Sequence, residues 1–136
     1  MDFRIWAVLS AVFAGATAIL VKKGVTEVPT TAAMAVRVAI IFVISVIGAY
    51  ALKERITGIS ASAWGFLAAS AVTTGLSWWC YFQALRGGPV SVVAPIDKLS
   101  FVIAVVLGAV MLGEAISLKV GIGVVLIVAG VLVTLS

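Results

Sequence analysis

Two adjacent charged residues, Asp97 and Lys98, lie inside an apolar stretch that runs from Ala84 to Glu114. A charged side chain at the centre of a bilayer costs about 2.5–3.5 kcal/mol on insertion scales. Pro95 comes just before the pair, and because proline lacks a backbone N–H, it removes one hydrogen bond from a helix. Charge and broken backbone are tolerated at membrane depth mainly where they face protein or a water-filled cavity. We therefore expect this segment to line a solute pathway and Pro95 to bend its helix.

Polar and aromatic side chains of other apolar stretches lie at a similar depth. Counting 1.5 Å per residue from the nearest predicted helix end places Arg37 about 9 Å, Trp78 about 10 Å and Asp97 about 12 Å deep. The three residues fall in the same half of the predicted helix bundle, so we expect them to share a cavity. The full set of expected pathway residues is Lys23, Arg37, Ser77, Trp78, Trp79, Tyr81, Asp97 and Lys98.

Several of these residues also have a purely structural interpretation. The adjacent lysines at positions 22–23 lie where interfacial side chains extend to the headgroups, and Arg37 is close enough to its helix end to do the same. Trp78 lies near the inner edge of an aromatic belt. Asp97 and Lys98 are able to neutralise each other as a structural ion pair. The sequence leaves these alternatives open.

The composition indicates a protein embedded in a lipid bilayer. Of its 136 residues, 64% are hydrophobic and 10% are charged, whereas a soluble domain averages roughly a quarter charged residues. Nine Lys and Arg against five Asp and Glu give a formal charge of +4, but they form no basic stripe with aromatic residues, so we expect no nucleic-acid partner. The sequence has no histidine, a single cysteine, Cys80, and no nucleophile–base or metal-ligand cluster. We therefore expect no enzymatic activity, no metal and no cofactor.

The apolar pattern predicts five membrane-spanning helices joined by short loops, since a span needs about 20 apolar residues. The predicted helices cover residues 5–21, 31–52, 61–85, 89–112 and 119–134. Small residues recur at every fourth position from Ala61 to Ser77, which predicts a tight packing face on the third helix. We expect an all-α membrane protein, a bundle of five transmembrane helices that forms a single domain over residues 1–136.

The charges near the helix ends give a weak orientation signal. Lys and Arg near span ends set the orientation of a membrane protein. One side carries four such residues and the other carries three, namely Arg4, Lys53, Arg55 and Lys119 against Lys22, Lys23 and Arg86. A chain with so small a bias is able to insert both ways, so we expect an antiparallel homodimer. A parallel homodimer, or a heterodimer with a second five-helix half, remains open.

Several segments resemble the EamA domain of the drug/metabolite transporter superfamily. These are ALRGGPVSVVAP at 84–95, LGE at 112–114 and GIGVVLIVAGV at 121–131. SWWCYFQAL at 77–85, PIDKLS at 95–100 and AILVKKG at 18–24 resemble its five-helix, half-length bacterial and archaeal branch. One departure is that Ser100 and Phe101 occupy the region where ten-helix relatives often carry a second proline.

The resemblance implies an integral-membrane secondary transporter of the plasma or inner membrane that exports small metabolites or drugs. Full-length members are two inverted five-helix repeats, so this chain corresponds to one half-repeat of a ten-helix transporter whose site lies at the repeat interface. We expect a dimer in which Asp97 carries an ion or proton and contacts substrate, with Lys98 or Arg37 as its charge partner. The alternatives are a non-transporting accessory subunit of a heteromeric transporter and a narrow channel.

Overall fold

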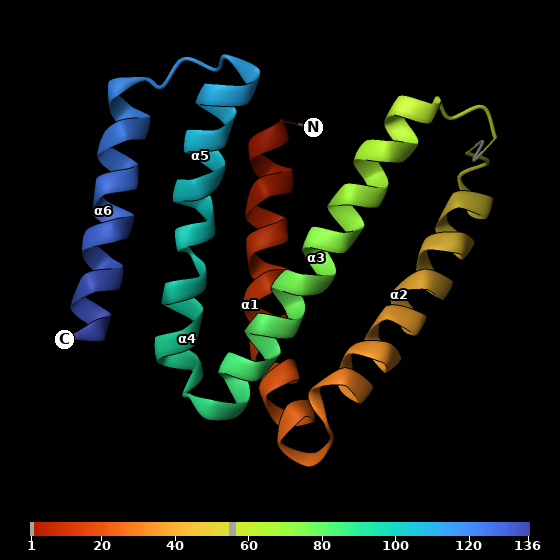
Figure 1. Cartoon of the computed structure of the whole chain (residues 1–136), viewed down its shortest axis with the longest axis horizontal. Coiled ribbons are helices and arrows are strands. Elements are labelled where there is room, and N and C mark those ends of the chain that lie inside the picture. Colours follow the sequence, from red (N-terminus) through yellow and green to blue (C-terminus); the bar gives the residue numbers. More distant parts are fainter. Residues whose placement is uncertain (1, 55–56) are drawn as a thin grey trace. The chain divides into compact units, whose positions relative to one another are not determined.

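The computed structural model describes residues 2–54 and 57–136, and every regular element in those ranges is an α-helix. The helices are α1 (Phe3–Glu27), α2 (Thr30–Ala51), α3 (Ala61–Gly87), α4 (Val90–Asp97), α5 (Leu99–Leu112) and α6 (Leu118–Leu135) (Figure 1). Arg55, one of the basic residues used above for orientation, lies outside the described residues. The chain divides into two compact units, one ending at Arg86 and the other beginning at Gly87.

In the first unit, α1 continues to Glu27 instead of ending at Val21 as predicted. A single glycine, Gly24, costs a helix only about 1 kcal/mol, which is too little to stop it. The stop comes from Pro29, because the residue before a proline favours extended backbone. Val28 has φ −128° and ψ 156°, and α2 begins two residues later at Thr30.

The buried side chains of the first unit lie close to the turn between α1 and α2. They come from α1, from the first residue of α2 and from the last turns of α3, and they are Ala18, Val25, Thr30, Phe82 and Leu85. Figure 1 shows the C-terminal half of α3 crossing α1 near this turn. The packing of this unit is therefore concentrated at the end where α3 finishes.

In the second unit, the helical hydrogen-bond ladder is interrupted at Lys98, which separates α4 from α5. Pro95 has no N–H to donate to the carbonyl of Ser91. The Lys98 N–H donates to the Pro95 carbonyl and the Phe101 N–H donates to the Lys98 carbonyl, both at 3.0 Å and both across three residues instead of four. The break falls beside Asp97, and a bend of the helix axis there remains a prediction.

The Leu-Gly-Glu segment at 112–114 ends α5 with a glycine-dependent cap. Gly113 adopts the left-handed conformation, with φ +69°, that a glycine tolerates without strain. The Glu114 N–H donates to the Gly108 carbonyl at 3.2 Å, which satisfies one of the last carbonyls of the helix. Ser117 then accepts a hydrogen bond from the Val120 N–H at 3.3 Å, and α6 returns alongside α5 (Figure 1).

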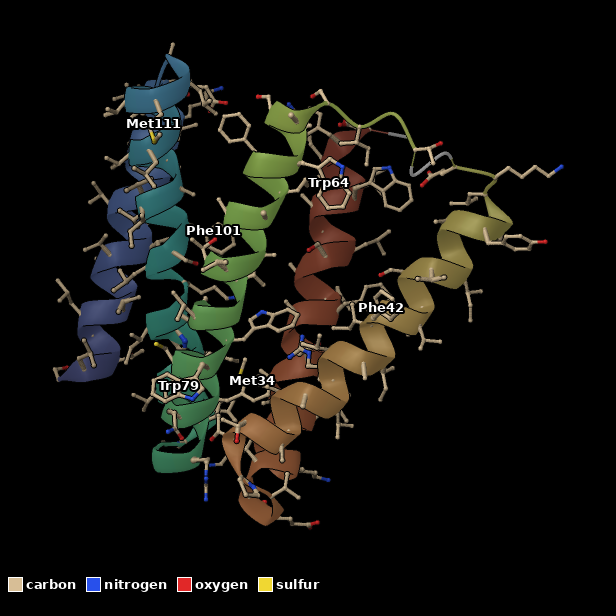
Figure 2. The ribbon with its side chains drawn as sticks, turned by 45° about the vertical axis from the view of Figure 1, so that its right-hand side comes forward. Met34, Phe42, Trp64, Trp79, Phe101 and Met111 are labelled. Atoms are coloured by element: carbon tan, nitrogen blue, oxygen red, sulfur yellow. The ribbon has the colours of Figure 1, made fainter. Side chains whose placement is uncertain are left out.

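Four helical stretches among the described residues are long and apolar enough to cross a membrane. They are Phe3–Glu27, Thr30–Ala51, Val90–Leu112 and Leu118–Leu135. Large apolar side chains of these helices are exposed, among them Phe42 and Met111, which are labelled in Figure 2 and whose exposed fractions are 66% and 75%. Such a surface suits lipid or a partner helix and not water.

The third of the five predicted spans, α3, is not among the four. Its 27 residues extend about 40 Å, which exceeds the roughly 30 Å hydrocarbon core. The helix is less apolar because serine, threonine and tryptophan residues replace aliphatic ones along its length. The described residues therefore form an all-helical structure with four apolar spans.

Candidate functional site

The guanidinium of Arg37 lies over two aromatic rings of α3. Its Cζ is 4.3 Å from the ring centroid of Trp78 and 5.7 Å from that of Phe82. Trp78 and Phe82 are four residues apart, so they share one face of the helix. A cation over an aromatic face is stabilised by about 0.5–2 kcal/mol, more when it is removed from water. This contact joins the first half of α2 to the C-terminal half of α3.

Arg37 is half-buried at membrane depth and faces α3. It follows the first residue of α2 by seven positions, or about 10 Å along the axis. Tyr81, on the same turn of α3 as Trp78, is close enough to interact electrostatically with the guanidinium. The structure thus brings together Arg37, Trp78 and Tyr81 from the predicted set, and it adds the buried Phe82.

No carboxylate within residues 2–54 and 57–86 lies within 4.0 Å of the Arg37 guanidinium. The acidic residues of these ranges are Asp2, Glu27 and Glu54, at the ends of α1 and α2. Inside its own unit, Arg37 is therefore held by aromatic faces and not by an opposite formal charge.

Two hydrogen bonds connect helices near the contact of Arg37 with Trp78 and Phe82. The Thr30 hydroxyl donates to Gln83 Oε1 at 2.8 Å, and Thr30 is 4% exposed. The Lys22 Nζ donates to the carbonyl of Leu85 at 2.5 Å. Because the last four carbonyls of a helix lack intrahelical partners, this ammonium group caps α3, where the helix dipole also favours a cation.

The sequence did not reveal these contacts of Lys22, Thr30 and Phe82. A backbone carbonyl such as that of Leu85 carries no signature in the side-chain sequence. Phe82 lies one helical turn after Trp78, and this spacing is the one signal that marks it as a second ring on the same face.

Other residues of the predicted set lie at the surface of this chain. Lys23 and Ser77 are exposed, and Trp79 keeps 44% of its surface accessible. Consecutive residues of a helix point about 100° apart, so Trp79 cannot share the face that Trp78 presents to Arg37. A role for these residues in a pathway stays a prediction that requires a partner surface.

In the second unit, Asp97 and Lys98 form an ion pair next to the helix break. Lys98 Nζ lies 3.6 Å from Asp97 Oδ2, with 46% and 37% of the two side chains exposed, respectively. Lys98 Nζ also lies 5.6 Å from the ring centroid of Phe101. Asp97 is half-buried in the single chain. The pair fits both an ion-binding site and a self-neutralising structural pair.

Comparison with known proteins gives matches that cover almost the whole chain. Residues 4–136 match the family model of the EamA-like transporter family. A protein of a Sinorhizobium species, described as "Uncharacterized transporter in cobO 3'region", is 38% identical over 133 residues, which are 96% of this chain and 94% of that protein. No solved structure matches the chain.

Proposed function

This chain belongs to the EamA-like transporter family, and we propose that it is a secondary transporter that exports small metabolites or drugs across the plasma or inner membrane. Its membership and its four apolar spans make it a multi-pass membrane protein of a transporter family. The observation that supports a solute site most directly is Arg37 stacked on Trp78 at 4.3 Å. An ionisable side chain at this depth is costly in lipid and usually marks a substrate or ion pathway.

We include α3 as a fifth span. It is long enough to cross the hydrocarbon core, and its one charged residue, Arg86, lies in the last turn. Hydroxyl groups and tryptophan are tolerated inside a bundle when they face other helices. In this arrangement, α3 supplies the aromatic side chains of the site, Trp78 and Phe82.

Asp97 is the proposed carrier of a coupling ion or proton. Its carboxylate is paired with Lys98 and is more than one-third exposed, so a solute or ion is able to reach it. The break between α4 and α5 leaves irregular backbone beside it, and discontinuous helices are a common feature of transporter sites. Pro95 is proposed to bend this helix during the transport cycle.

The proposed functional form is an antiparallel homodimer. The small-residue ladder on α3 is exposed in the single chain, and no atom outside its own helix lies within 4 Å of a Cβ added at Gly65. A helix of a second chain is therefore able to approach this face closely. Two oppositely inserted copies would imitate the inverted repeats of full-length transporters and place the site near the midplane.

Labelling of a C-terminal tag from each side of the membrane tests the orientation. Labelling from both sides supports dual insertion. Labelling from a single side excludes it and points to a parallel dimer or to a heterodimer with a second half-length chain.

A second candidate function is an accessory subunit that does not transport by itself. The contacts of Lys22 with Leu85 and of Thr30 with Gln83 favour it, because both are hydrogen bonds that connect one helix to another. In that case the polar residues of this half stabilise the bundle, and a partner chain supplies the pathway.

Flux through liposomes that contain the purified protein alone separates these candidates. A panel of labelled metabolites, anionic drugs and cationic drugs is loaded on one side, and exchange is followed on the other. Saturable exchange supports the transporter, whereas a rate that rises linearly with concentration indicates a channel. Absence of flux for every compound, with flux restored by a co-reconstituted partner, would establish the accessory role.

A further inference from the structure

We propose that Arg37 recognises the negative charge of the solute, and that the solutes are small organic anions with an apolar, preferably aromatic, body. This inference rests on the proposed transport function and assigns a substrate class to the same site.

The aromatic stack leaves the hydrogen-bonding edge of Arg37 available. The Cζ atom lies over the rings of Trp78 and Phe82, and a ring face is not a conventional hydrogen-bond acceptor. The five N–H donors point outward in the plane of the group, so stacking does not consume them. A carboxylate, sulfonate or phosphate binds that edge through two parallel hydrogen bonds.

The N–H groups of Arg37 are also accessible. Among the described residues that are not exposed, no fully buried side-chain nitrogen or oxygen lacks a hydrogen-bond partner. Arg37 is half-buried, and no carboxylate lies within 4.0 Å of it inside residues 2–54 and 57–86. Its donors are therefore not sealed inside the protein, and an acceptor from outside is able to reach them.

The charge of Asp97 is neutralised within the other unit. Asp97 pairs with Lys98 at 3.6 Å, whereas Arg37 has aromatic partners in its own unit. Because an isolated charge in a low-dielectric site is strongly disfavoured, an anion from outside would lower the energy of the site. The structure thus favours an anionic solute at Arg37 over a cationic one.

The rings of Trp78 and Phe82 also constrain the apolar part of the solute. Phe82 is 1% exposed and serves as support, but Trp78 is only half-buried and keeps ring surface accessible. A flat apolar body next to the bound anion contacts this surface, and aromatic pairs gain about 0.5–1.5 kcal/mol beyond area burial.

The test measures binding to the purified protein in detergent by calorimetry. Benzenesulfonate is the anionic probe, benzenesulfonamide is its uncharged analogue, and tetraphenylphosphonium is a cationic aromatic probe. We expect benzenesulfonate to bind at least about 10-fold more tightly than benzenesulfonamide, as for a hydrogen bond between charged groups. Arg37→Gln is expected to remove this preference. Arg37→Lys keeps the positive charge but loses the two parallel N–H donors, so it is expected to reduce the preference.

The matched control is Arg86→Gln, which removes an exposed arginine from the last turn of α3 and should leave the preference unchanged. Equal binding of the two sulfonyl probes to the unmodified protein would overturn the inference, even if the Arg37 variants do not fold. Binding of tetraphenylphosphonium alone, binding of no probe, or an unchanged preference in Arg37→Gln would also overturn it.

Flux measurements in liposomes keep the two proposals apart. Saturable exchange of tetraphenylphosphonium without binding of benzenesulfonate would leave the transporter intact and refute the anion site. Arg37-dependent binding of benzenesulfonate without exchange of any compound would support the anion site and refute transport by this chain alone.

Discussion

Replacement of Lys22 by methionine tests whether the first unit is held together at the end of α3. The Nζ of Lys22 donates to the carbonyl of Leu85 at 2.5 Å, and Leu85 is 0% exposed. Lys22→Met keeps an unbranched side chain of similar length but removes both the donor and the charge. The Leu85 carbonyl then has no cationic partner in a position closed to solvent.

The expected loss of stability follows from three contributions. A hydrogen bond that involves a charged group contributes about 1.5–3 kcal/mol, and an unpaired buried carbonyl costs about 1–3 kcal/mol. A cation at the C-terminus of a helix adds about 0.3–1 kcal/mol when it is at the surface. These terms overlap, since they describe the same pair of groups. We therefore expect Lys22→Met to lower the free energy of unfolding by about 2 kcal/mol, or roughly 30-fold in the equilibrium constant.

The measurement is reversible unfolding of the purified protein in mixed micelles with increasing SDS, followed by circular dichroism. Lys23→Met is the matched control, because Lys23 is the next residue of α1 and its side chain is exposed. It should change the free energy of unfolding by less than about 0.5 kcal/mol, as for an ordinary surface substitution. Equal losses in the two variants would show that Lys22 acts only through the charge of the helix end, and the argument for a specific cap would be refuted.

Three further substitutions test other parts of the structure. Thr30→Val removes the hydroxyl that donates to Gln83 and should cost about 1 kcal/mol in the same unfolding assay. If the double variant Thr30→Val/Gln83→Leu loses no more stability than Gln83→Leu alone, the two side chains act as a pair. Asp97→Asn should abolish coupled exchange in liposomes while leaving insertion intact, and exchange at the unmodified rate would exclude Asp97 as the ion carrier. Pro95→Ala restores an N–H near Ser91 and should slow exchange more than it weakens binding; a selective loss of binding would contradict a role in the conformational cycle.

The positions along each helix axis were the most predictable part of this protein. The rise per residue of a helix is fixed, so depth follows from counting along the sequence. Arg37 and Trp78 were placed in the same layer by this counting, and the structure brings them to 4.3 Å. The helix ends were less predictable, because α1 continues past Gly24 until Pro29 forces extended backbone.

The rotation of each helix decides which side chains of a layer meet, and the sequence constrains this rotation weakly. Trp78 and Trp79 have the same chemistry and almost the same depth, yet one contacts Arg37 and the other is 44% exposed. Hydrophobic periodicity fails to separate them because nearly every face of a membrane helix is apolar. Contacts with backbone groups, such as that of Lys22 with the Leu85 carbonyl, cannot be predicted from the pattern of side chains.

Arg37 and Asp97 differ in how their charge is balanced, and this difference has consequences for the proposed transport cycle. Asp97 carries its counter-charge on the adjacent residue, Lys98, so its charge is balanced without a solute. Arg37 is stabilised in its own unit by the rings of Trp78 and Phe82, which bind a cation without neutralising it. An anion that joins Arg37 therefore changes the net charge of its site, whereas a solute at Asp97 must compete with Lys98. Since a ligand shifts a conformational equilibrium only through its different affinity for the two states, the larger shift is expected from the anion at Arg37.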